Sequence, residues 1–165
     1  MNQLVIYRIA TYILLPFGAF LGFGVLFMLL AALGNFALLL PVFIAGATVI
    51  YIFASLVFLG HVQKQSLCKH SLKDWILVNA YVALFMVVNL MANLVVVVFY
   101  PDSFRETVQH FMDTQGSSLS GISAAQMLRT VKGVLYVMGF LGMVLFVHIM
   151  LSFRLIKRNK DLFEH

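Results

Sequence analysis

Four polar side chains that could take part in chemistry lie deep inside the long apolar segments of this chain: those of Asn79, Asn89, Asn93 and His148. An amide donates and accepts hydrogen bonds, and an imidazole can also carry a proton or bind a metal. All 6 acidic residues, and every Lys and Arg, fall at or beyond the ends of these segments. Ion-coupled transporters, proton relays and voltage sensors usually keep charges at depth, so the sequence disfavours those functions.

The three asparagines predict one polar face on a helix. Asn89 precedes Asn93 by one helical turn and Asn79 precedes it by two heptads, which brings all three to one side. An unpaired amide in hydrocarbon is costly, so this face is expected to look inward. Gly139 and Gly142 lie at a matching depth in the last apolar segment and would let another backbone approach. We expect the asparagines to hydrogen-bond to that helix, with a ligand, a quinone headgroup or a hydrated pathway as alternatives.

His148 is expected at the level of Tyr81 and Asn79, as a neutral imidazole paired with a neighbouring hydroxyl or amide. Further hydroxyl groups at depth belong to Thr48, Tyr51 and Ser55. A haem b ligand is the alternative role, but its second histidine would have to be His61, roughly 10 Å away in depth. The sequence therefore predicts no cofactor and no metal site.

The amino-acid composition indicates whether these polar groups lie in a soluble protein or in a membrane. Of the 165 residues, 62% are hydrophobic and 10% are charged, whereas soluble domains carry about 25% charged residues. Four apolar segments, residues 9–33, 36–60, 75–100 and 133–153, reach the roughly 20 residues that a helix needs to cross a bilayer. We predict an all-α integral membrane protein, a single domain over residues 1–165 with an antiparallel bundle of four transmembrane helices.

Small residues indicate how the first two segments meet. Only Gly34 and Asn35 separate them, which predicts a tight reversal and a helical hairpin. Gly18 and Gly22 form a GxxxG pattern, which is typical of closely packed membrane helices.

The distribution of basic residues predicts the orientation. The N-terminal flank, the loop of residues 61–74 and the tail of residues 154–165 hold eight of the 11 Lys and Arg residues. The longer segment of residues 101–132 holds the other three. Since cytoplasmic flanks retain positive charge, both termini are expected to lie in the cytoplasm. The membrane is expected to be a bacterial inner membrane. The net charge of +5 then reflects topology and anionic headgroups, and no nucleic-acid partner is expected.

The outer segment is expected to contain a short amphipathic helix in the membrane interface. Ser103 and Glu106 form a capping-box pattern at its start. Its apolar stripe consists of Phe104, Val108, Phe111 and Met112. This helix could cover the bundle or dock a partner.

A second capping-box pattern, Ser123 with Gln126, predicts that the last helix begins near Ala124. That helix would continue to about Lys160, well beyond the bilayer core. Cys68 is the single cysteine and is expected to be a free thiol in the cytoplasmic loop, with lipidation or redox activity as alternatives.

No known catalytic motif occurs, although an enzyme that uses His61, His70 or His110 stays an alternative. The chain is expected to be a non-catalytic subunit or accessory factor of a larger membrane complex, with the lipid bilayer and other membrane subunits as partners. The first alternative is a small self-associating carrier or channel that uses the polar face of the third segment. A haem- or quinone-binding subunit is the second.

Overall fold

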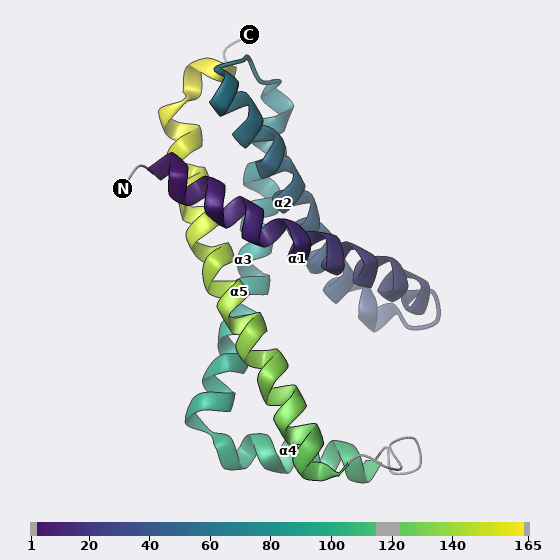
Figure 1. The fold of residues 1–165 in the computed structure, drawn as a ribbon. Coiled ribbons are helices and arrows are strands. Elements are labelled where there is room, and N and C mark those ends of the chain that lie inside the picture. Colours follow the sequence, from purple (N-terminus) through teal and green to yellow (C-terminus); the bar gives the residue numbers. More distant parts are fainter. Residues whose placement is uncertain (1–2, 115–122, 164–165) are drawn as a thin grey trace. The chain divides into compact units, whose positions relative to one another are not determined.

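The computed structural model describes residues 3–114 and 123–163, which are almost entirely helical (Figure 1). Along the chain the elements are α1 (Gln3–Ala32), the 3-10 turn η1 (Phe36–Leu38), α2 (Leu39–Lys64), α3 (His70–Phe99), α4 (Pro101–Thr114), α5 (Ala124–Arg158) and the 3-10 turn η2 (Lys160–Phe163). No strand occurs in the two described ranges. Four helices, α1, α2 extended by η1, α3 and α5, are long and apolar enough to cross a membrane. This confirms the predicted all-helical class and its four long apolar helices.

The helices extend beyond the apolar segments because their backbone hydrogen bonds continue into polar flanks. α2 runs on past Gly60 to Lys64. Gln65 then adopts a left-handed conformation with a φ of 49°, and its N–H donates to the carbonyl of His61. Such a left-handed residue is a common way to end a helix, although glycine is the usual choice there.

The chain forms two compact units, residues 1–87 with 144–165 (unit 1) and residues 88–143 (unit 2). In unit 1, α1 and α2 lie side by side (Figure 1). The chain reverses between them at Gly34 and Asn35, and the Asn35 side chain accepts a hydrogen bond of 3.1 Å from the backbone N–H of Ala37. The short polar turn therefore lies at the position that the sequence predicted.

Glycines allow α1 to approach α2. A Cβ atom on Gly18 would lie 3.0 Å from Cγ2 of Ile52, and one on Gly22 would lie 3.7 Å from Cγ1 of Val49. A side chain at Gly18 would therefore require Ile52 to shift, whereas Gly22 has ordinary van der Waals space. The core of unit 1 includes other elements as well, and its largest fully buried aromatic and aliphatic side chains are those of Tyr7, Leu14, Tyr51, Ile52, Phe58, Leu59, Ile76, Leu145 and Ile149.

Unit 2 contains the end of α3, the whole of α4 and the first part of α5. α4 begins at Pro101, directly after Tyr100, so Ser103 lies inside the helix and the predicted capping box with Glu106 is wrong. Pro101 starts the helix earlier because its fixed φ suits a first turn and its missing N–H costs nothing there. The first helical bond runs from the N–H of Phe104 to the carbonyl of Tyr100, at 3.0 Å.

The second predicted capping box is confirmed. The N–H of Gln126 donates to Oγ of Ser123 at 3.2 Å, and the N–H of Ser123 donates to Oε1 of Gln126 at 3.1 Å. These reciprocal bonds satisfy two backbone donors at the start of α5. The helix accordingly begins at Ala124, as expected, and ends at Arg158.

The apolar stripe of α4 is only partly covered. Phe104 and Val108 are buried together with Val97 of α3, and four residues of α5 pack against them, namely Met127, Leu128, Val131 and Leu135. Phe111 is exposed and Met112 is half-buried. The predicted stripe thus forms the small core of unit 2 through its first half, while its second half has little cover.

Candidate functional site

Three helices of unit 1 each contribute two polar residues, one helical turn apart, to a single buried cluster. α1 supplies Tyr7 and Thr11, α2 supplies Tyr51 and Ser55, and α5 supplies His148 and Ser152. We call these six residues the His148 cluster. Every one of them is 0% exposed. Buried polar groups on this scale have to satisfy one another, because neither water nor lipid can do so.

Both ring nitrogens of His148 are engaged. Nε2 lies 2.9 Å from Oγ1 of Thr11, and Nδ1 lies 2.7 Å from the hydroxyl of Tyr51. The imidazole also stacks on the ring of Tyr7, with centroids 4.4 Å apart and planes 12° apart. The position of His148 is therefore fixed by α1 and α2 together.

The hydrogen bonds define a direction. The hydroxyl of Thr11 donates to the carbonyl of Tyr7 at 2.8 Å, which uses its only hydrogen. Thr11 must then accept at its oxygen, so we assign the proton of a neutral imidazole to Nε2 of His148. Nδ1 is left as an acceptor for the Tyr51 hydroxyl. This assignment gives a hydrogen-bond partner to the Thr11 hydroxyl, to both ring nitrogens of His148 and to the Tyr51 hydroxyl.

Ser152 lies on the far side of the cluster, with its Oγ 2.8 Å from the Tyr51 hydroxyl, 3.3 Å from the Tyr7 hydroxyl and 3.0 Å from the carbonyl of His148. Its single hydrogen serves one of these three acceptors at a time, because Tyr51 donates to His148. The Tyr7 hydroxyl donates to the carbonyl of Ser55 at 3.3 Å. No buried side-chain nitrogen or oxygen in the described residues lacks a partner. A closed set of neutral donors and acceptors is suited to fixing the register of three helices.

The predicted pairing of His148 with neighbouring hydroxyl groups is confirmed, and these hydroxyls belong to Thr11 and Tyr51. Tyr81, expected at the level of His148, is exposed, and its ring lies against Phe153 with centroids 5.4 Å apart. Counting along a helix gives depth but not direction, so Tyr81 can match the height and still face away. A sequence signal for the true partners exists: Tyr7 with Thr11, and His148 with Ser152, are polar pairs at a spacing of four in apolar helices.

The asparagines do not bridge α3 to α5. Nδ2 of Asn79 donates to the carbonyl of Trp75 in its own helix, at 2.7 Å. Nδ2 of Asn93 donates to the carbonyl of Asn89 at 2.8 Å and to its Oδ1 at 3.0 Å. Asn89 and Asn93 are exposed and Asn79 is half-buried. The expectation of an inward-facing amide face is therefore wrong for Asn89 and Asn93.

The glycines of α5 instead contact apolar side chains of α3 in unit 2. A Cβ atom on Gly139 would lie 2.8 Å from Cδ2 of Leu94. One on Gly142 would lie 2.9 Å from Cε of Met91 and 3.1 Å from Cβ of Leu90. Close approach at these glycines was a correct expectation, but its partners are apolar because the packed face of α3 lies about a third of a turn from the asparagines.

Both ring nitrogens of His148 already have hydroxyl partners, so binding a haem iron would first require one of those bonds to break. Nδ1 of His61 lies 2.9 Å from Oγ of Ser66. Residues 3–114 and 123–163 contain no group of three or more His, Cys, Asp or Glu side chains that could hold a metal ion.

Cys68 is a buried free thiol in the segment between α2 and α3. Its exposed fraction is 5%, and its N–H donates to the carbonyl of Leu162 at 2.7 Å. This bond joins the α2–α3 loop to η2 at the end of the chain. Burial raises the pKa of the Cys68 thiol, since the thiolate loses hydration.

We expect Cys68 to react slowly with a maleimide at neutral pH. A raised pKa leaves less thiolate, by about tenfold for each unit, and burial restricts access. Alkylation should accelerate as the pH rises above the usual thiol pKa. The matched control is Gln63→Cys in a Cys68→Ser background, because Gln63 is exposed at the end of α2. Equal rates at the two positions in folded protein would contradict the burial of Cys68.

Comparison with known proteins gives no assignment for these residues. No family model matches the chain, and neither curated proteins nor solved structures gave a match. Function therefore has to be inferred from the geometry of the described residues.

Proposed function

We propose that this chain is a non-catalytic subunit or accessory factor of a larger membrane protein complex. The observation that carries the proposal is the exposure of two asparagines, Asn89 and Asn93, on a helix apolar enough to cross a membrane. Soluble proteins place such residues in water at no cost. A transmembrane helix does so only where another polar group meets them.

The amides keep unused hydrogen-bonding capacity. Asn93 donates to Asn89 within the helix, but the described residues provide no hydrogen bond for Nδ2 of Asn89 or Oδ1 of Asn93. In hydrocarbon each such group costs several kcal/mol. A neighbouring transmembrane helix with its own polar side chains would supply the missing partners. Polar groups of this kind specify register and partner more than they add stability.

The asparagines occupy one flank of α3, with Val96 beside them. Asn89, Asn93 and Val96 are all exposed and recur at spacings of four and three. We call them the asparagine face. Val98 is also exposed, but lies on the opposite flank by helical geometry. The proposed partner therefore contacts one defined side of α3.

The His148 cluster supports a structural rather than a catalytic role. Its groups are fully buried and pair with one another, so no substrate can reach them without opening the unit. We propose that its register-fixing bonds hold the hairpin of α1 and α2 against the end of α5 within unit 1.

For the membrane arrangement, we propose an antiparallel bundle with both termini in the cytoplasm of a bacterial cell. The support is the concentration of Lys and Arg in the flanks of residues 61–74 and 154–165. We place α4 in the outer interface, because Phe104 and Val108 pack inward while Arg105 and Glu106 are exposed.

Site-specific photo-crosslinking in native membranes tests the proposed partner. A crosslinking residue at Val96 should give one discrete adduct with another membrane protein, whereas the same residue at Val98 should give none. Replacing both asparagines by leucine should lower the Val96 adduct about eightfold, since two interhelical bonds at about 0.6 kcal/mol each are lost.

Two other outcomes of this crosslinking experiment would argue against the proposed partner. An adduct with a second copy of this chain, together with solute flux in liposomes of the pure protein, would favour the self-associating carrier or channel. Adducts at Val96 that consist only of lipid would contradict a partner at the asparagine face.

A further inference from the structure

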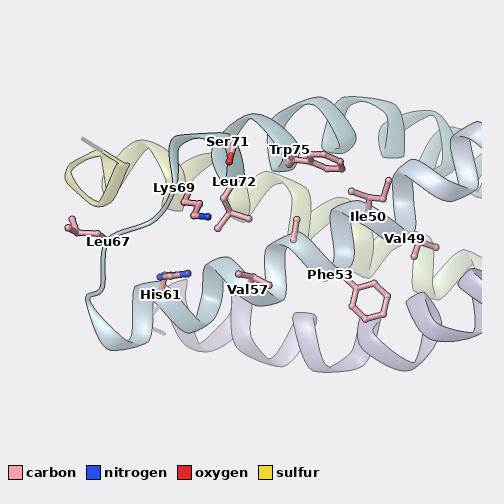
Figure 2. Close-up of a pocket in the computed structure, with 11 residues that line it drawn as sticks. Val49, Ile50, Phe53, Val57, His61, Leu67, Lys69, Ser71, Leu72 and Trp75 are labelled. Carbon is pink, nitrogen blue, oxygen red and sulfur yellow. The ribbon is translucent and has the colours of Figure 1, made fainter. Parts of the chain in front are cut away.

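A groove lies between α2 and the first part of α3 in unit 1 (Figure 2). Its volume is ≈ 680 Å³, which falls within the range of about 300 to 1,000 Å³ that is common for small-molecule sites. Residues from Val49 in α2 to Trp75 in α3 line it. The groove is separate from the His148 cluster and from the asparagine face, and it shares no residue with either.

The groove has one polar end and one apolar end. Lys69, Ser71 and His61 lie at the end beside the α2–α3 loop, and Figure 2 shows Lys69 and His61 on opposite sides of it. Val49 and Ile50 lie at the other end. This order of groups is that of an amphiphile, with a charged head and an apolar tail.

The length of the groove matches one leaflet of a bilayer. From Val49 to His61 the rise along α2 is about 18 Å. Half of the hydrocarbon core is about 15 Å. A lipid whose head lies at the loop would therefore have its tail alongside α2 for the whole depth of its leaflet. Trp75, a residue type common at the headgroup level, lines the groove between the two ends.

The charge at the polar end is positive and available. Among the described residues the only salt bridge is the one between His70 and Asp74, at 3.3 Å, so Lys69 has no carboxylate partner there. Nδ1 of His61 lies 2.9 Å from Oγ of Ser66, and we assign the Ser66 hydroxyl as the donor, which places the proton of a neutral imidazole on Nε2. An ammonium group, a hydroxyl and an imidazole N–H together suit a phosphate.

We propose that this groove binds an anionic phospholipid of the membrane, with its phosphate at Lys69, Ser71 and His61 and one acyl chain along α2. Basic pockets between transmembrane helices on the cytoplasmic side are known sites for acidic headgroups. A second groove of ≈ 550 Å³, between α1 and α2, makes a useful contrast. Its lining contains Gly18, Gly22 and Gly46 but no charged residue, so it offers nothing to a phosphate.

Trp75 provides the readout, because it is the only tryptophan of the chain. The full-length protein would be reconstituted in phosphatidylcholine vesicles with a minor fraction of phosphatidylglycerol that carries brominated acyl chains. Bromine quenches tryptophan at contact distance. We expect Trp75 quenching well above that produced by the same fraction of brominated phosphatidylcholine.

Two variants test separately how the groove binds the lipid headgroup and how it binds the acyl chain. Lys69→Gln should weaken the preference for the anionic lipid about fivefold, the value of one basic side chain near an anionic headgroup. Ala54 also lines the groove, one turn from Ile50. Ala54→Phe leaves the charge unchanged and fills the apolar part of the groove, so it should also remove the excess quenching. Lys73→Gln is the matched control, because Lys73 carries the same charge and does not line the groove; it should keep the preference.

The proposal is overturned if anionic and zwitterionic brominated lipids quench equally in the native protein. It is also overturned if the excess survives both Lys69→Gln and Ala54→Phe, or if Lys73→Gln removes it as fully as Lys69→Gln. If inorganic phosphate removes the difference between anionic and zwitterionic brominated lipids while both still quench Trp75, the polar end binds a free anion, and the lipid assignment is overturned as well.

Discussion

Replacing His148 by alanine is expected to lower the free energy of unfolding by about 3 to 5 kcal/mol. The imidazole is 0% exposed, lies between hydroxyl groups of α1 and α2 and stacks on Tyr7. Its loss leaves a cavity and strands the hydroxyls of Thr11 and Tyr51. Individual hydrogen bonds between membrane helices average only about 0.6 kcal/mol, so the cavity contributes most of the loss.

The measurement is a steric-trap or denaturant unfolding curve in one bilayer mimetic. His110→Ala is the matched control, since His110 is exposed on α4, and its effect should stay within about 0.5 kcal/mol. Tyr51→Phe should be non-additive with His148→Ala, because both remove the same bond. Equal losses for His148→Ala and His110→Ala would show that the cluster does not hold unit 1 together.

Gly139→Leu is expected to have the second-largest effect, a loss of about 1 to 3 kcal/mol from overpacking in unit 2. Even a Cβ atom at this position would lie 2.8 Å from Cδ2 and 3.1 Å from Cδ1 of Leu94. Gly133→Leu in the same helix is the matched control, because nothing lies within 4 Å of its added Cβ. That control should be neutral or slightly stabilising, since leucine has the higher helix propensity.

A double-mutant cycle identifies the contact. Shortening Leu94 to alanine makes room, so Gly139→Leu should cost less in that background. By contrast, Asn89→Leu and Gly142→Leu should add, because Gly142 faces Met91 and Leu90 rather than an amide. Strong coupling between Asn89 and Gly142 would restore the bridge that the sequence predicted and contradict this packing.

The long apolar helices follow from the sequence because hydropathy and length alone select them. The turn at Gly34 and Asn35 and the start of α5 at Ser123 follow from local hydrogen bonds that short sequence patterns encode. Ser103 shows the limit of such patterns. The sequence offered two possible helix starts, a capping box at Ser103 and a proline two residues earlier, and the helix begins at Pro101.

Sequence alone could not assign the partners of the buried groups. His148 could be placed in depth, but its direction depends on how three helices rotate against one another. The asparagines show the same limit. Nothing in the spacing of Asn89 and Asn93 distinguishes a face turned to α5 from one turned away, because Leu94 and Met91 offer an equally good helical stripe.

The central proposal is that this chain belongs to a larger membrane assembly, and native mass spectrometry tests it most directly. The protein would be released from its own membranes in a mild detergent or native nanodisc, at its natural level of expression. We expect a particle that contains this chain and at least one other membrane protein in fixed proportion, and that loses the other protein when Asn89 and Asn93 are leucine. A monodisperse, folded particle made only of this chain would contradict the proposal.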